Sequence, residues 1–315
     1  MLRLDEWTGL AAGTLRAAIR AAFRGLSTAP LVGLALLWGD ASAAERQPWA
    51  STFEAQGSGD TSADTKSGYH AFHPTPQALL REMSTDRPDL TESPYTVDAG
   101  HAQVEVEAVT RTRDEGVDRT GYMGFLVKMG LTPRTDLQVG FESLHEDVPD
   151  EVEPEDGGGD TGPSNLTVRL KWNLWGNDGG GTAFAMMPYV VLPTAEGETD
   201  VAGGLILPLA ISGPWGTGLG TMAQVDAVPD ADGEGRHAEW LFTATVARDL
   251  FGDLAGFLEG TSGHRPRSEG TWTGLVNAGL TFAATPDLQL DTGARFGVSD
   301  AAEGSALFFG ISYRR

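Results

Sequence analysis

Apolar and polar residues alternate strictly along residues 165–174 of this chain. Because successive side chains of an extended strand point to opposite faces, the apolar members of this run share one face and the polar members share the other. The run has about ten residues, which is the length of a tilted strand that crosses a bilayer. The pattern predicts a strand with one face suited to lipid and the other to a water-filled lumen. The apolar face would hold Leu166, Val168, Leu170, Trp172 and Leu174, and the polar face Asn165, Thr167, Arg169, Lys171 and Asn173.

The same alternation recurs as far as the C-terminus, and twelve segments of this kind can be counted. Short turns and longer polar loops alternate between them, as in bacterial outer-membrane barrels, where periplasmic turns are short and outer loops are long. We therefore predict an all-β fold: a closed, antiparallel, up-and-down transmembrane β-barrel of about twelve strands, with both termini in the periplasm. The segments span about 101–111, 120–131, 135–145, 165–174, 182–193, 201–212, 215–228, 237–248, 253–262, 271–283, 287–297 and 304–313.

Prolines and loops make more specific predictions. The fifth and sixth segments contain Pro188 and Pro208. A proline inside a ladder removes a hydrogen-bond donor, so both strands are expected to bend or bulge there. The outer loops are expected at 112–119, 146–163, 194–200, 229–236, 263–270 and 298–303.

Alternation alone does not tell whether the apolar face meets lipid or a dry core, because a soluble lipocalin-like barrel has the same period. An N-terminal export signal, the asymmetry of the loops and the positions of the tryptophans favour the membrane. The tryptophans fall near predicted strand ends, where an aromatic girdle would lie. They are Trp172, Trp175, Trp215, Trp240 and Trp272.

The first 44 residues have the order of a secretory signal peptide. Arg16, Arg20 and Arg24 precede an apolar run at 29–38, and Ala41-Ser42-Ala43 supplies the small residues of a cleavage site. Cleavage after Ala43 or after Ala44 fits equally well. A short buried helix is the alternative, but no amphipathic partner helix follows. We expect the mature protein to be exported to the outer membrane of a Gram-negative bacterium.

Residues 45–84 are polar and show little periodicity. We expect them to form a flexible N-terminal extension. His70 and His73 lie in this segment, and two histidines at this spacing are a candidate metal pair. No further ligand is close in the sequence, so the pattern favours ordinary surface histidines and no metal site.

Composition narrows the classes of partner. The chain has 22 basic and 44 acidic residues, a formal charge of −22, which excludes nucleic acid as a partner. It contains no Cys, so disulfides and thiolate metal sites are excluded. After the N-terminal region it has no apolar run long enough for a transmembrane helix. The acidic loop at 145–160 offers oxygen ligands, but its spacing does not match an EF-hand and a solvated outer loop is favoured.

Residues 85–105 begin with Thr85-Asp86-Arg87-Pro88-Asp89-Leu90-Thr91-Glu92-Ser93-Pro94, and the chain ends with Phe308-Phe309-Gly310-Ile311-Ser312-Tyr313-Arg314 before Arg315. Both stretches resemble the transporter-like outer-membrane family called "putative MetA-pathway of phenol degradation". The resemblance covers roughly residues 84–315, with 85–100 as a lead-in and 101–315 as the barrel. It implies an outer-membrane β-barrel that passes small hydrophobic or aromatic molecules. The chain departs from such barrels at its last residue, which is not aromatic.

Charged side chains on the polar faces of the predicted strands would line the lumen. Rings of charges set what a pore admits. The same residues can also pair with one another and fill a narrow barrel, and the modest number of strands favours this second interpretation. The candidates are Lys128, Glu142, Arg169, Lys171, Asp226, Glu239, Asp291 and Arg295.

The segment Thr85 to Pro94 is a candidate plug, because polar residues and prolines are dense just before the first strand. In this hypothesis the segment enters the periplasmic mouth of the barrel and meets Arg169 and Lys171. A rigid lead-in is the alternative. The plug candidates are Asp86, Arg87, Asp89 and Glu92.

No motif indicates catalysis. The chain lacks a nucleophile elbow, a zinc-protease motif and a phosphate-binding loop. Ser262 and His264 are neighbours, but no third group of a triad can be identified, so a barrel hydrolase is a weak alternative. We expect the protein to have no enzymatic activity and no cofactor.

We predict a passive channel or transporter for a small-molecule solute, surrounded by outer-membrane lipids. A non-conducting barrel that serves as a surface-binding or structural protein is the alternative. The pattern does not indicate an oligomeric state.

Overall fold

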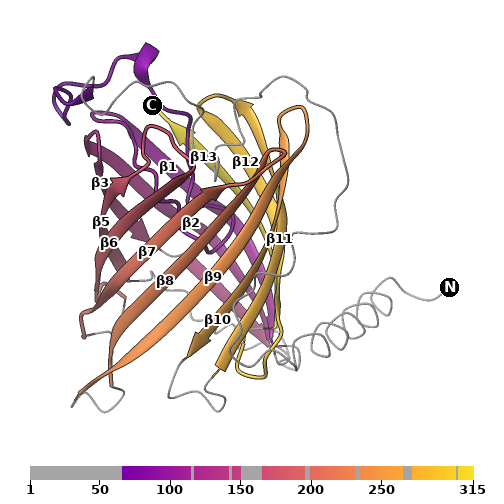
Figure 1. The fold of residues 1–315 in the computed structure, drawn as a ribbon. Helices are drawn as coiled ribbons and strands as arrows, with labels where there is room; N and C mark the ends of the chain where they lie inside the picture. The colour runs from indigo at the N-terminus through magenta and orange to yellow at the C-terminus, as the bar shows by residue number, and fades with distance from the viewer. Residues whose placement is uncertain are drawn as a thin grey trace.

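The computed structural model describes residues 66–114, 117–141, 144–149, 165–195, 199–230, 235–264, 272–302 and 304–315. They form one tilted β-sheet that curves into a barrel, with the first described residues at one end of it (Figure 1). The elements are the 3-10 helix η2 (Gln77–Leu79) and the strands β1 (Ala102–Asp114), β2 (Val117–Thr132), β3 (Thr135–Phe141), β4 (Leu144–Pro149), β5 (Leu166–Trp175), β6 (Thr182–Leu192), β7 (Ala202–Ser212), β8 (Thr217–Pro229), β9 (Arg236–Phe251), β10 (Leu254–His264), β11 (Trp272–Thr285), β12 (Leu288–Gly297) and β13 (Ser305–Arg314).

The sheet closes on itself because β1 pairs with β13 on one side and with β2 on the other. β3 and β4 both pair with β2, β3 with its C-terminal half and β4 with its N-terminal half, so together they occupy one position in the wall. The segments therefore build a closed barrel of twelve antiparallel strands, which confirms the predicted fold.

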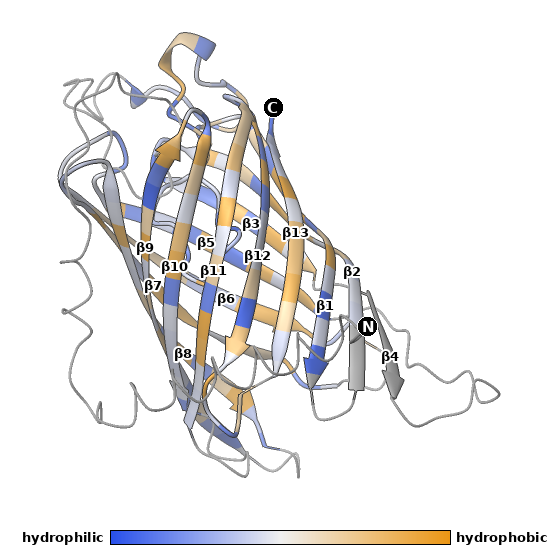
Figure 2. Ribbon diagram, turned by 90° about the vertical axis from the view of Figure 1, so that its right-hand side faces the viewer, coloured by the Kyte–Doolittle hydropathy of each residue, from blue (hydrophilic) through white to orange (hydrophobic). Residues whose placement is uncertain are grey.

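The strict alternation of the sequence becomes an inside and an outside. On β5, Leu170 and Trp172 are 40% and 47% exposed, whereas Lys171 and Asn173 between and beside them are fully buried. Figure 2 shows hydrophobic and hydrophilic residues alternating along the strands. A soluble barrel would bury its apolar face in a core. Here the apolar face is the outer one, as lipid contact requires.

The start of β1 and the C-terminus of the chain meet at one end of the barrel. Ala102 and Arg315 exchange backbone hydrogen bonds of 2.9 and 2.8 Å, and the C-terminus lies at this end in Figure 1. The short turns between β2 and β3 and between β11 and β12 lie there as well. This is the expected periplasmic end. The exposed Trp172, Trp175 and Trp215 lie toward it, and Trp272 lies toward the opposite end, so the tryptophans lie near both edges of the outer surface.

Two loop predictions were wrong. Residues 112–114 and 117–119, expected in an outer loop, belong to β1 and β2, because β1 continues to Asp114 and this residue pairs with Val117. Residues 146–149, also expected in an outer loop, belong to β4, which pairs with β2. We expected both strands to bend or bulge at their prolines, and the β6–β7 pairing shows no bulge there, because it keeps one register on both sides of Pro188 and Pro208. The missing N–H of a proline interrupts the hydrogen bonds between strands only locally. Opposite Pro188, no residue of β5 between Arg169 and Trp172 has a partner in β6.

The chain before β1 is held against the barrel from Lys66 onward. Lys66 Nζ lies 2.8 Å from Asp178 and 3.4 Å from Asp98, and the Ala71 N–H donates to the Leu131 carbonyl at the end of β2. Residues 66–84 thus make specific contacts where we expected a flexible extension. Residues 1–65, with the expected signal peptide, lie outside the described residues. Among the described residues no helix has the length and hydrophobicity of a membrane span.

Candidate functional site: the loop inside the barrel

Residues 81–99, which we call the inner loop, fold back into the barrel before β1 begins (Figure 1). Carboxylates on well-separated strands accept its backbone N–H groups. Glu105 on β1 accepts from Asp86 and Arg87, Glu259 on β10 accepts from Leu90, and the donor–acceptor distances are 3.0–3.1 Å. Because β1 and β10 lie on different parts of the wall, the inner loop crosses the lumen.

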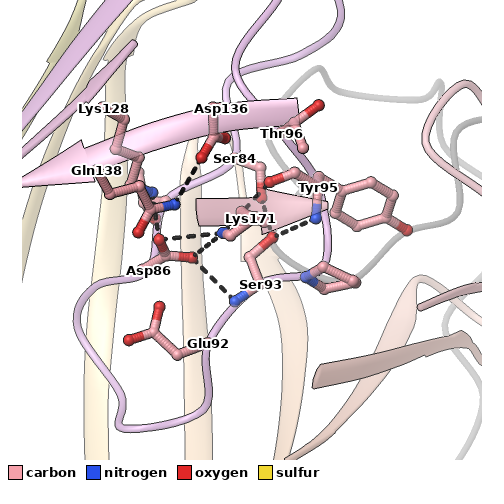
Figure 3. Close-up of polar contacts among 12 residues, drawn as sticks. Ser84, Asp86, Glu92, Ser93, Tyr95, Thr96, Lys128, Asp136, Gln138 and Lys171 are labelled. Atoms are coloured by element: carbon pink, nitrogen blue, oxygen red, sulfur yellow. Dashed lines mark hydrogen bonds and ion pairs between the residues drawn. The ribbon is translucent and has the colours of Figure 1, made fainter. Parts of the chain in front are cut away.

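A buried lysine pair holds the first part of the inner loop (Figure 3). Asp86 lies 2.6 Å from Lys128 Nζ of β2 and 2.8 Å from Lys171 Nζ of β5. Lys128 also contacts Glu105. Burial alone would raise the pKa of the Asp86 carboxyl, but the two ammonium groups outweigh burial and hold this pKa well below its usual value. Asp86 is therefore ionised inside the barrel.

Glu259 holds the tip of the inner loop. Its carboxylate accepts from the Leu90 N–H and from Thr91 Oγ1, the latter at 2.6 Å. Thr245 of β9 and Asn277 of β11 donate to the same carboxylate. Charge-assisted bonds of this kind are stronger than neutral ones, so this one wall residue fixes the position of the tip.

Two arginine contacts link the loop to the rest of the wall. Arg87 of the loop lies 2.9 Å from Asp291 and 3.0 Å from Glu107. Arg169 of β5 contacts Glu92 of the loop. Burial raises the pKa of the Glu92 carboxyl to about 7, although the Arg169 guanidinium opposes this shift. Near neutral pH the charged and neutral forms of Glu92 therefore have similar free energies.

Asp89 of the inner loop lies beside Glu259, and its Oδ2 has no hydrogen-bond partner among the described residues. Burial, and then the neighbouring Glu259 carboxylate, raise the pKa of Asp89 well above its usual value. The docked loop therefore favours the protonated form of Asp89 more than water does.

One side of the lumen is apolar. Tyr95 of the inner loop packs on Ala183 of β6 and Ala210 of β7. Farther from the periplasmic end, side chains of β6, β7 and β8 form a second cluster, which Tyr189 and Leu241 extend. The lumen wall is therefore amphipathic, with this face opposite charged and amide side chains. The cluster consists of Met187, Ile206 and Met222.

Three other candidates have contacts with residues of the wall. Asp226 accepts from Tyr189 Oη, Glu239 lies 3.3 Å from His237, and the Arg295 guanidinium carbon lies 5.7 Å from the Phe308 ring centre. Glu142 lies outside the described residues. Glu259, Thr243, Thr245 and Asp136 contact the loop, and Asn277 supports Glu259, but all five were absent from our candidates. The alternation within each strand predicts that these side chains point into the lumen. No feature of the sequence distinguishes them from other inward-facing residues.

The histidine and serine candidates do not form a site. Ser262 accepts from the Trp272 indole at 2.9 Å, and His264 stacks on Trp240. His70 and His73 face each other across an isolated bridge, with ring centres 5.9 Å apart. Within the described ranges, no three His, Cys, Asp or Glu side chains are arranged to hold a metal ion.

Comparison with known proteins agrees with the fold. The family model described as "Putative MetA-pathway of phenol degradation" matches residues 85–314. The COG4313 outer membrane channel from Pseudomonas putida F1 is similar in structure, with a TM-score of 0.51 and 14% identity over 74% of this chain and 100% of that chain. The NanC porin has a TM-score of 0.48 and 11% identity over 67% of this chain and 98% of that chain. No curated protein sequence matches the chain.

Proposed function

Because the chain belongs to the family "Putative MetA-pathway of phenol degradation", whose match covers the loop–barrel unit described above, we propose that it is an outer-membrane channel for small solutes, gated by the inner loop. The barrel resides in the outer membrane of a Gram-negative bacterium, with lipids against its apolar face. The protein moves solutes passively and performs no chemistry.

The observation that carries this proposal is how the inner loop is held. Its contacts with the wall are mainly hydrogen bonds and ion pairs, among them those of Asp86, Arg87 and Thr91. Water and counterions can replace such contacts one by one, whereas a loop packed in an apolar core would have to expose that core on leaving. The loop therefore closes the lumen and can be released from the wall. Asp86, Arg87, Asp89 and Glu92 act as the plug residues, as we proposed from the sequence.

The composition of the wall supports small amphipathic solutes. The apolar side chains of β6–β8, Met187, Ile206 and Met222, would contact the hydrophobic part of a solute. The charged and amide residues of the other strands would contact its polar part. Lumen charges then set selectivity, with Lys128, Arg169, Lys171 and Asp291 occupied by the loop in the closed state and Asp226, Glu239 and Arg295 farther along the path.

An engineered disulfide tests the gate directly. The chain has no cysteine, and Thr91 Oγ1 of the loop lies 2.6 Å from Thr243 Oγ1 of β9. In the variant Thr91→Cys/Thr243→Cys, oxidation should tie the loop to the wall. We expect oxidised protein in liposomes to pass small solutes slowly and reduced protein to pass them at the wild-type rate.

The matched control is Ser84→Cys/Ser93→Cys, whose hydroxyl oxygens lie 2.6 Å apart within the loop itself. This disulfide closes the loop on itself without tying it to the wall, so oxidation should change the flux much less. Equal flux through oxidised and reduced Thr91→Cys/Thr243→Cys would contradict gating by the loop. No flux in either state would support the alternative, a non-conducting barrel.

A further inference from the structure

The ion pair between Arg169 and Glu92 differs from the pair between Lys171 and Asp86. The side chains of Lys171 and Asp86 are 0% and 3% exposed, whereas those of Arg169 and Glu92 are 21% and 14% exposed. This pair is therefore open to the lumen. The loop–wall pairs that involve Asp86 are sealed from it.

The pair is also incompletely satisfied. Arg169 makes one hydrogen bond within the described residues, from Nη1 to Glu92 Oε1. Glu92 Oε2 is buried and has no hydrogen-bond partner there. A guanidinium can bind both oxygens of a carboxylate at once through parallel N–H donors. Glu92 does not use this geometry, so a better-placed carboxylate would compete with it.

An apolar surface adjoins Arg169. Tyr189 is its direct partner across β5 and β6, and Met187, Ile206 and Met222 lie next to Tyr189. The Glu92 N–H approaches the Met222 sulfur to 3.5 Å. Glu92 thus presents a carboxylate to Arg169 from a backbone that lies on the methionine surface.

Negative charge lies farther along the same row. A Cβ at Gly204 would lie 2.7 Å from Asp226 Oδ1 and 2.9 Å from Tyr189 Cε1. The side chains of Asp226 and Tyr189 can therefore meet above β7 only because residue 204 has no side chain. Asp226 is in turn the register partner of Glu239 on β9. The row therefore runs from one cation at Arg169 to two carboxylates on the other side of Tyr189.

We propose that Arg169 is the receptor for a small monocarboxylate with an apolar body, and that Glu92 occupies its place when the lumen is empty. The ligand's carboxylate binds the guanidinium. Once the loop withdraws, the ligand's apolar body lies on Met187, Ile206 and Met222, which are buried while the loop is docked. The Asp226 and Glu239 carboxylates repel a second negative charge, so dicarboxylates are rejected. Binding of the ligand removes the contact between Arg169 and the loop and favours release of the loop. This inference rests on the proposed function, because the ligand must enter the lumen.

Titration calorimetry of the full chain in detergent tests the site with three probes. Benzoate has one carboxylate on a ring, benzamide is neutral with the same shape, and isophthalate has two carboxylates. We expect benzoate to bind. Benzamide and isophthalate should bind more weakly by on the order of tenfold or more, because only benzoate matches the charge of the site.

The variants separate Arg169 from Glu92. Arg169→Gln should lose benzoate binding, and Arg169→Lys should keep part of it, since an ammonium lacks the fork geometry. Glu92→Gln removes the internal competitor and should strengthen binding on the order of tenfold. A gain of affinity cannot arise from misfolding. Arg134→Gln, in the exposed turn between β2 and β3, is the control for the loss of one positive charge and should leave binding unchanged.

Equal benzoate affinity in wild type, Arg169→Gln and Glu92→Gln would overturn the site, as would benzamide binding as tightly as benzoate. The liposome assay is independent of this measurement. Flux without Arg169-dependent binding would overturn the site and keep the channel. Arg169-dependent binding without flux would keep the site and overturn the channel.

Discussion

Lys171 Nζ of β5 lies 2.8 Å from Asp86 Oδ1 of the inner loop, although the two residues are 85 positions apart in the chain. Both side chains are almost fully buried. The contact joins the wall of the barrel to a segment that precedes its first strand, so the order of the loop depends on a completed barrel. The contact is also the centre of the polar network that fills the periplasmic half of the lumen.

Lys171→Met should loosen the inner loop while leaving the barrel intact. Removing one partner of a buried ion pair costs about 3 kcal/mol, because the remaining charge loses its compensation. Asp86 retains Lys128, so the loss is partial. Hydrogen exchange of the Asp86 and Arg87 amides should quicken, whereas strand amides should not. The double variant Asp86→Asn/Lys171→Met should recover part of the protection, since no uncompensated carboxylate remains. Unchanged exchange in Lys171→Met would contradict the proposed role of the pair.

Glu259→Gln should free the tip of the loop. An amide keeps one acceptor oxygen but turns a donor toward Leu90, Thr91 or Asn277, which all donate to Glu259. The loss is about 2 kcal/mol for hydrogen bonds to a charged acceptor. We expect faster exchange at Leu90 and higher single-channel conductance. Glu239→Gln is the control, because Glu239 also faces the lumen but contacts His237. If both variants conduct alike, Glu259 does not hold the gate.

Gly130→Ala should displace the end of the inner loop. A Cβ at Gly130 would lie 2.0 Å from the Asp98 carbonyl oxygen and 2.7 Å from that of Val97, so the backbone of the loop would have to move. The matched control is Gly140→Ala on β3, where the nearest atom is the flexible end of Leu126 at 3.3 Å. We expect Gly130→Ala, and not Gly140→Ala, to raise solute flux. A crystal structure of Gly130→Ala with residues 97–98 unmoved would refute this expectation.

The docked loop should weaken as the pH rises through 7. The pKa of Glu92 is raised from 4.5 to about 7 in the docked loop, so the docked state binds the proton more tightly than the released state. Docking therefore loses stability between these two values as Glu92 ionises. Asp89, whose pKa is also raised, acts in the same direction. Asp86 acts in the opposite direction, because its lowered pKa stabilises docking above 3.8 and this contribution is lost as the pH falls below that value.

Flux measurements between about pH 5 and about pH 8 test this dependence. Flux should rise with pH in the wild type, and the rise should be smaller in Glu92→Gln and in Asp89→Asn, which carry no titratable group at these positions. A wild-type flux that falls with pH would reverse the sign and exclude these two acids as the cause. The groups around Glu92 that set its charge are Arg169, Lys171, Lys128 and Asp86.

The sequence by itself determined the barrel. Strand positions, the outward face and the shared end of the start of β1 and the C-terminus follow from a period of two residues and from the lengths of the connections, which are local properties of the chain. The same period placed Lys128, Lys171 and Asp291 on the inner face, where the structure has them. The family resemblance agrees with the match over residues 85–314.

Only the tertiary structure decided which inward residues meet the inner loop. Arg87 reaches Asp291 across 204 positions of sequence, and the Glu259 contact with Thr91 spans 168. Alternation tells which way a side chain points, but the partner depends on the closure of the sheet and on the path of a loop with no period of its own. For the same reason residues 66–84 looked unstructured in the sequence: their order comes from contacts with residues distant in the chain, such as Asp178 and Leu131.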